Sequence, residues 1–330
     1  MKFITLILLS TILNTQAKGI VPKVLYGTDD RHEVEKYSNP MIRDISLSVA
    51  GRVSQYDMFP SVETESDSEI QNLHSDILEL YRDLGLEVPQ SILSELPQIS
   101  SNGEEVSYYD YEALSLEDSI NACSTERFIK QPTLMSCTGF LVGKDILVTA
   151  GHCMVNNFDC SGNNWVFNFR NGVKKIPANS VYKCKKIIAQ EQVSIPILGT
   201  TDYALIQLDR EVTTGKPLKF RTKGRIKKGA SVAVIGHPLG LPLKIADNAK
   251  VRGVFGKTFK ANLDTYGGNS GSPVVDIETG LVEGILVHGA GDLRQQGGCT
   301  VSRKEDGMKE GIYKITRLKM LQEYFKSGNL

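Results

Sequence analysis

The chain has 330 residues, of which 41% are hydrophobic and 23% charged, and its 38 basic residues balance its 38 acidic residues. This is the composition of a globular protein that is long enough for one large or two modest hydrophobic cores. It excludes a mini-protein that needs disulfides or a metal ion to stay folded. A net charge of zero also argues against a protein that chiefly coats nucleic acid or an anionic membrane. We therefore expect no nucleic-acid partner.

The N-terminal residues 1–17 predict a secretory signal peptide. Lys2 precedes a mostly apolar run from Phe3 to Leu13, and small residues follow it up to a cleavage site after Ala17. The run is too short to span a bilayer, which takes about 20 residues. We expect a secreted or periplasmic protein without a membrane anchor, and we expect it to be a monomer.

An acidic segment follows the N-terminal residues 18–56, which we expect to contribute to the first folded unit. Residues 57–118 hold sixteen acidic residues against Arg82 alone. Within them, apolar residues at spacings of three and four predict an amphipathic helix from Glu69 to Leu84. Prolines and a Ser-Ser-Asn-Gly run around the helix predict extended or poorly ordered chain.

Three roles are open for this acidic insertion or pro-like segment. It is a solvated surface loop, which costs little closure entropy, or a binding element for a basic partner, or a device that hinders substrate entry until it is nicked near residues 100–103. Residues 119–330 carry thirty basic residues against seventeen acidic ones. Opposite charge would hold the insertion against that part of the protein over a Debye length of about 8 Å.

The rest of the chain predicts short β-strands separated by turns. The apolar run from Phe140 to Thr149 predicts a hairpin, and Trp165 to Phe169 alternates up to the turn dipeptide Asn171-Gly172. Further strands are expected at 181–188, 203–208, 231–235, 257–263, 273–276 and 281–287. Many short strands with few helices indicate an all-β barrel or sandwich. At the end, residues 316–326 predict an amphipathic helix.

The chain has six cysteines, an even number that in an exported protein indicates disulfides. They are Cys123, Cys137, Cys153, Cys160, Cys184 and Cys299, and the sequence leaves fifteen pairings open. A zinc site is the alternative, but no Cys-x-x-Cys pair occurs and the nearest spacing matches no structural zinc pattern. We expect neither a metal nor an organic cofactor.

Three short motifs carry side chains suited to acyl transfer. His152 lies in a Thr-Ala-Gly-His-Cys run after an apolar strand, Asp202 lies at the start of another, and Ser270 lies in Gly-Gly-Asn-Ser-Gly-Ser-Pro. A lone His or Asp is more often structural than catalytic. The glycines around Ser270 are more specific, because they let backbone N–H groups converge beside a hydroxyl, as a developing oxyanion requires.

Together the motifs resemble the chymotrypsin-fold (trypsin-like) serine peptidases, in which His, Asp and Ser follow in that order. The Gly-Asn-Ser-Gly-Ser-Pro run, an early Tyr-Gly-Thr-Asp-Asp-Arg and Gly-His-Pro-Leu-Gly-Leu-Pro are similar to the secreted bacterial glutamyl-endopeptidase-like branch. The resemblance covers residues 20–56 and 119–330 and leaves 57–118 unmatched. It implies two packed antiparallel six-stranded β-barrels, one over 119–212 and one over 213–330 with the C-terminal helix.

The same resemblance implies a serine endopeptidase that hydrolyses protein or peptide substrates through an acyl-enzyme. Ser270 would be the nucleophile, His152 the general base, and Asp202 the residue that orients the imidazole. The N–H groups of Gly268 and Ser270 would form the oxyanion hole. The alternative is a catalytically weak or latent peptidase-fold binding protein, with the acidic segment as a partner-binding or inhibitory element, but no triad residue is substituted.

The resemblance also implies disulfide pairs and specificity residues. A disulfide brackets the His-bearing hairpin in this fold, which implies Cys137 with Cys153, and the remaining pairs would be Cys160 with Cys184 and Cys123 with Cys299. Asp264 lies where trypsin-like enzymes place the acid that binds Lys or Arg, so we expect cleavage after basic residues. His288 lies near the His of glutamyl endopeptidases and offers the opposite specificity; a structural role is the alternative for both.

One departure from the family pattern concerns activation. Trypsin-like zymogens place an Asp before the nucleophile, where it pairs with a newly cut N-terminal amine, and this chain has Asn269 there. An amide cannot make that ion pair. Any activation step would work differently.

Overall fold

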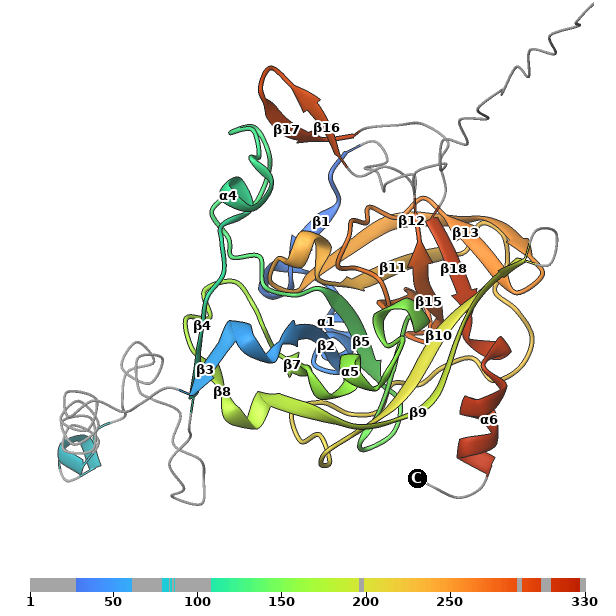
Figure 1. Ribbon diagram of the computed structural model, residues 1–330, viewed down its shortest axis with the longest axis horizontal. Helices are drawn as coiled ribbons and strands as arrows, with labels where there is room; N and C mark the ends of the chain where they lie inside the picture. Colours follow the sequence, from blue (N-terminus) through green and yellow to red (C-terminus); the bar gives the residue numbers. More distant parts are fainter. Residues whose placement is uncertain are drawn as a thin grey trace, which may run out of the picture.

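The computed structural model describes residues 28–60, 79–82, 84, 86, 108–195, 199–289, 293–303 and 310–326. These residues fold into two β-barrels that pack against each other (Figure 1). The expected signal peptide, the region 100–103 and most of the expected helix at Glu69–Leu84 lie outside the described residues; within that helix, residues 79–82 are helical.

The first barrel is a closed ring of six antiparallel strands. In ring order these are β10 (Gly199–Leu208), β6 (Ile146–Thr149), β5 (Cys137–Leu141), β2 (Val49–Ser54), β7 (Asn163–Phe167) and β9 (Val181–Ile195). Its interior is filled by large side chains that are almost wholly buried, among them Trp165, Phe140 and Tyr182. The expected hairpin at 140–149 forms the β5–β6 pair of this barrel.

The second barrel is also antiparallel. Its strands are β12 (Lys244–Phe255), β11 (Ser231–Gly236), β14 (Pro273–Asp276), β15 (Val282–His288), β18 (Glu310–Lys314) and β13 (Thr258–Ala261), and β13 pairs back with β12 to close the ring. The chain ends in the short helix α6 (Lys319–Lys326). Leu318 and Leu321 are fully buried there, so the helix packs its apolar face on the protein.

The N-terminal segment contributes to both barrels. Strand β2 belongs to the first, whereas β1 (Arg31–Glu33) pairs with β12 of the second, a pairing that the sequence did not indicate. Smaller elements lie outside the barrels: α1 (Pro40–Ser46), α4 (Leu116–Ile120), α5 (Asn157–Ser161) and the hairpin of β16 (Leu293–Gln296) with β17 (Cys299–Ser302).

The two ends of the acidic insertion are held together in a small three-stranded sheet. Strand β3 (Met58–Pro60) pairs with β4 (Tyr108–Tyr111), which pairs with β8 (Ile176–Pro177). This sheet lies at the left of Figure 1, far from β18 and α6 at the right. The insertion therefore leaves the first barrel and returns to it at one place.

Three disulfides are present, Cys137–Cys153, Cys160–Cys184 and Cys123–Cys299, and they are the pairs that the resemblance implied. Disulfides of this kind are typical of an extracytoplasmic protein. In the part of the chain that the structure describes, no helix has the length and apolarity needed to cross a membrane.

Candidate active site

His152 and Asp202 meet where the first barrel opens toward the second. His152 lies in η3 (Gly151–Cys153), directly after β6, and Asp202 lies on β10, which pairs with β6. Asp202 accepts the backbone N–H of His152 at 3.0 Å through Oδ1, and its Oδ2 lies 2.8 Å from the imidazole Nδ1. The Asp202 side chain is 7% exposed and the His152 side chain 30%. The carboxylate is therefore fixed inside the barrel while the imidazole reaches solvent.

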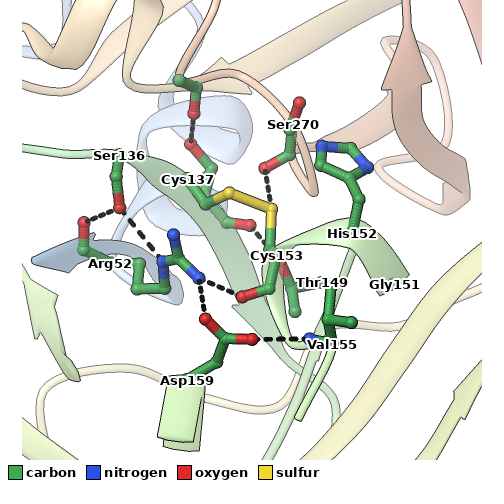
Figure 2. Close-up of a disulfide and its surroundings, with 12 residues drawn as sticks. Arg52, Ser136, Cys137, Thr149, Gly151, His152, Cys153, Val155, Asp159 and Ser270 are labelled. Carbon is green, nitrogen blue, oxygen red and sulfur yellow. Dashed lines mark hydrogen bonds and ion pairs between the residues drawn. A yellow bond between two sulfur atoms is a disulfide. The ribbon is translucent and has the colours of Figure 1, made fainter. Parts of the chain in front are cut away.

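Ser270 comes from the second barrel and lies at the same junction. Its carbonyl accepts the N–H of Thr138 on β5 at 2.8 Å, and Figure 2 shows Ser270 and His152 both to the right of the Cys137–Cys153 disulfide. The turn comes this close because the next residue is Gly271, at φ +91°, where a Cβ atom would lie 2.0 Å from the Thr138 carbonyl oxygen. The Ser270 carbonyl also lies 3.8 Å from the Cys153 sulfur, so the structure places the Ser270 backbone beside the residue that follows His152.

Thr138 joins the two barrels through its backbone N–H and its hydroxyl. Its hydroxyl donates to the Gly268 carbonyl at 2.8 Å and accepts the His237 N–H at 3.2 Å. Its own carbonyl accepts the Thr149 hydroxyl at 2.6 Å, in addition to the N–H bond to Ser270. Because Thr138 is fully buried, these bonds do not compete with water. They set the position of the Ser270 turn relative to β5 and β6.

Two backbone N–H groups beside Ser270 are free of protein acceptors. Within the described residues, neither the Gly268 N–H nor the Ser270 N–H donates a hydrogen bond, whereas the N–H groups of Asn269 and Gly271 donate to Tyr266 and Leu286 at 3.0 and 2.8 Å. Gly268 has φ +89°, and a Cβ there would lie 2.3 Å from the His237 carbonyl oxygen. The tight turn therefore leaves both expected oxyanion-hole donors available to a ligand.

Arg52 on β2 contacts the chain next to the Cys137–Cys153 disulfide. No pattern in the sequence predicted this role. Its guanidinium donates to the Cys153 carbonyl and, at 3.0 Å, to the Ser136 hydroxyl (Figure 2). Asp159 lies 3.8 Å from the guanidinium and accepts the Val155 N–H at 2.9 Å. Burial lowers the pKa of Arg52, which the nearby Asp159 partly offsets. This contact fixes the chain that follows His152.

Asp264, the first expected specificity residue, is 2% exposed and is engaged by the N-terminal segment. Its Oδ2 accepts the backbone N–H of Asp30 at 2.8 Å. Arg31, 1% exposed, pairs with Asp29 at 2.6 Å and lies 4.4 Å from the centre of the Tyr266 ring. Burial opposes the charge of Arg31, but its bond to Asp29 and the nearby Asp264 carboxylate together raise its pKa. The charge of Asp264 is therefore largely balanced within the protein.

His288, the second expected specificity residue, is exposed at the end of β15. It pairs with Gly311 of β18 and lies two residues after Leu286, whose carbonyl accepts the Gly271 N–H at 2.8 Å. The two candidates thus differ in environment: one is buried and neutralised, and the other reaches solvent near the Ser270 turn.

Possible metal ligands gather at one place among the described residues. The ligating atoms of Cys137, His152 and Cys153 lie within 4.8 Å of one another. Both sulfur atoms are joined in the disulfide, so neither is a thiolate and the group does not form a zinc site of the usual kind.

His237 packs beneath the Ser270 turn in the loop between β11 and η5 (Pro238–Gly240). It is buried, and its Nδ1 lies 2.9 Å from the Leu241 carbonyl oxygen. Burial lowers the pKa of His237 to about 4, and the charge of Lys244 acts in the same direction. In the same loop, the Leu239 N–H donates to the Gly267 carbonyl at 2.6 Å. A neutral His237 is therefore part of the support of the turn.

Part of the chain is similar to a known protein family. Residues 137–285 match the family model of the trypsin-like peptidase domain, and the match contains His152, Asp202 and Ser270. A crystal structure of Rv3671c from M. tuberculosis H37Rv, in an inactive form, is similar with a TM-score of 0.41 and 13% identity over 92% of this chain and 97% of that one. No curated protein matches the sequence significantly. Residues 137–285 are thus similar to the trypsin-like peptidase domain.

Replacing Thr138 with Val tests the junction of the barrels. The change keeps the shape of the side chain but leaves the Gly268 carbonyl and the His237 N–H without their partner. Since one unsatisfied buried polar group costs about 1–3 kcal/mol, we expect the free energy of unfolding in urea to fall by about 2 kcal/mol or more. Thr138→Ser keeps the hydroxyl and should recover most of the loss. A Val variant as stable as the wild type would show that the hydroxyl contributes nothing.

The pKa of His237 predicts a pH-dependent stability. The unfolded chain takes up a proton near the ordinary pKa of 6.5, whereas folded His237 does so only near 4. The contribution of this group is therefore complete above pH 6.5 and is lost as the pH falls to 4, a change of about 3 kcal/mol. His237→Gln should reduce the loss of stability between pH 6.5 and 4, measured by urea unfolding. Parallel pH profiles for variant and wild type would contradict this.

Proposed function

We propose that the protein is a secreted serine endopeptidase that cleaves peptide bonds with Ser270, His152 and Asp202. The observation that carries the proposal is the double contact between Asp202 and His152, together with the N–H groups of Gly268 and Ser270, which have no acceptor among the described residues. Acyl transfer requires a general base, a group that orients this base and donors that stabilise the oxyanion. His152, Asp202 and the two N–H groups would supply these in turn. A trypsin-like peptidase domain over residues 137–285 supports this chemistry.

The proposed mechanism depends on which imidazole nitrogen of His152 faces Asp202 and which one faces Ser270. The ionised Asp202 accepts the Nδ1 proton of His152, so Nε2 carries the lone pair that takes the Ser270 hydroxyl proton during attack on the substrate carbonyl. The imidazolium that forms is stabilised by the same carboxylate, and it then gives the proton to the leaving amine. Water repeats the sequence on the acyl ester, which releases the second product and restores Ser270.

Negative charge develops on the substrate oxygen in both steps. The N–H groups of Gly268 and Ser270 would bind it, and loss of one such donor typically costs about 2.7–4 kcal/mol of barrier. Because the Gly268 conformation is set by contact with the His237 carbonyl and the Thr138 hydroxyl, the two donors are in place before substrate arrives. This preorganisation avoids a reorganisation cost during the reaction.

Specificity is the second part of the proposal. Asp264 already binds the Asp30 N–H and lies near the Arg31 guanidinium, so little of its charge is left for a basic substrate side chain. His288 is exposed beside the strand that contacts the Ser270 turn. This contrast moves our expectation from basic residues to Glu before the scissile bond, as in the glutamyl-endopeptidase-like branch that the sequence resembles, with Asp264 as an anchor of the N-terminal segment.

Ser270→Ala tests the nucleophile. Turnover of a peptide substrate should fall by several orders of magnitude, roughly 10⁴-fold or more, while the unfolding midpoint in urea stays the same. Ser272→Ala is the matched control, because the Ser272 hydroxyl lies two residues away and has no hydrogen-bond partner among the described residues. Its activity should be close to that of the wild type. An active Ser270→Ala variant would refute the assignment.

Peptides that differ only at the residue before the scissile bond test the specificity. We expect kcat/KM to be higher for Glu than for Lys, and we expect His288→Ala to remove this preference by taking away the imidazole that would bind the Glu carboxylate. Asp264→Asn should instead lower stability, since it weakens the contact with Asp30, and should leave the Glu preference in place. A preference for Lys that Asp264→Asn abolishes would restore the original expectation.

A further inference from the structure

A pocket of about 640 Å³ opens on the second barrel, away from the candidate active site. Its walls come from the loop 222–225, the β12–β13 turn and the start of the C-terminal segment; the lining residues are Thr222, Lys223, Gly224, Arg225, Val254, Gly256, Lys314, Thr316, Arg317 and Gln322. None of them belongs to the Ser270 turn or to the first barrel. Lys314 of β18 and Gln322 of α6 line the pocket, and these two elements lie at the right of Figure 1.

The lining is basic and contains no acidic residue. Lys223, Arg225 and Arg317 are exposed and Lys314 is buried, and none of the four forms an ion pair within the described ranges of the chain. Two other cations near this barrel, the half-buried Arg221 and the buried Lys244, behave differently. Arg221 pairs with Glu283 at 2.6 Å, and Lys244 pairs with Glu33 at 3.0 Å. The four basic side chains of the pocket therefore have no acidic partner among the described residues.

The Lys314 ammonium is held in the pocket by backbone carbonyl groups. It donates to the carbonyl groups of Phe255 and Gly256 at 3.1 and 2.9 Å, which uses two of its three donors. Burial lowers the pKa of Lys314, and the charges of Arg317 and Arg225 lower it further. The cations thus repel one another in a fixed arrangement, and an oxyanion in the pocket would relieve that repulsion and accept charge-assisted hydrogen bonds.

The positive charge continues beyond the pocket. Residues 216–228 contain seven basic residues and no acidic one, and Lys227 and Lys228, just after Arg225, are exposed. A single small anion needs only the pocket. A linear polymer with repeated anionic groups would use both the pocket and this flank, so the distribution favours a polyanion.

We propose that this pocket binds a sulfate group of a sulfated polysaccharide, with Lys227 and Lys228 contacting the next anionic groups along the chain. The three disulfides are typical of an extracytoplasmic protein, which favours a glycan over nucleic acid. The acidic insertion is the less suitable occupant, because its ends at Pro60 and Tyr109 pair in the small sheet across the molecule (Figure 1). Binding here would hold the protein on a surface while leaving the candidate active site at Ser270 uncovered.

The test measures binding of a defined heparin oligosaccharide to the full chain at about 0.15 M salt. The double variant Arg225→Glu with Arg317→Glu should weaken binding roughly tenfold or more, because two charge-assisted contacts become repulsive. Lys183→Glu with Lys185→Glu is the matched control: it makes the same change in net charge at exposed positions of β9 and should change affinity little. Equal losses in both double variants, or no binding by the wild type, would overturn the proposal.

Three further binding measurements identify the ligand. Desulfated heparin should bind much more weakly than heparin, and equal affinity would refute recognition of sulfate. Single-stranded DNA of equal charge should bind less tightly, and tighter binding would assign the pocket to nucleic acid instead. Deletion of residues 61–107 should leave heparin affinity unchanged, whereas a large gain would show that the acidic insertion occupies the pocket. Circular dichroism and cleavage of a small peptide should be unchanged in both double variants, which shows that they fold.

Discussion

The hydrogen bonds of Thr138 are the physical constraint on which the candidate active site depends. His152 and Asp202 belong to the first barrel and Ser270 to the second, so their geometry is only as precise as the contact between barrels. Thr138 makes that contact directly, since it binds the carbonyl groups of Gly268 and Ser270. Its carbonyl also accepts the Thr149 hydroxyl, which ties the same residue to the strand that leads to His152. One buried residue, through its backbone and its side chain, thus connects both halves of the site.

Charge is distributed in two ways that fit two different tasks. Near the site, buried charged groups have partners: Asp202 binds the His152 imidazole, and Arg31 pairs with Asp29. Pairing keeps the site stable without substrate, and breaking a buried pair typically costs about 3–5 kcal/mol. In the pocket around Lys314, cations lie together without acidic partners. The first arrangement holds a geometry for chemistry, and the second is suited to a ligand that supplies the missing negative charge.

Local patterns in the sequence were sufficient for part of this account. Continuous apolar runs predicted β5, β6 and β11, and the glycines around Ser270 indicated the turn that β14 follows. Polar strands gave a weaker signal: the prediction for β9 ended at 188, whereas the strand continues through exposed residues to Ile195. The hairpin of β16 and β17 was missed because most residues of β16 are exposed and polar. Strand β12 was missed as well; charged residues interrupt its apolar positions.

Side-chain partners that lie far apart in the chain could not be predicted in this way. Asp264 accepts a hydrogen bond from Asp30, which is 234 residues away, and nothing near either residue signals the other. The proposed peptidase activity depends on Ser270 as an activated nucleophile. The most direct test of this role is mass spectrometry of the protein after treatment with a fluorophosphonate. The account predicts one covalent adduct, on Ser270, that His152→Ala largely removes. An adduct on another serine, or none in a preparation that hydrolyses peptides, would contradict it.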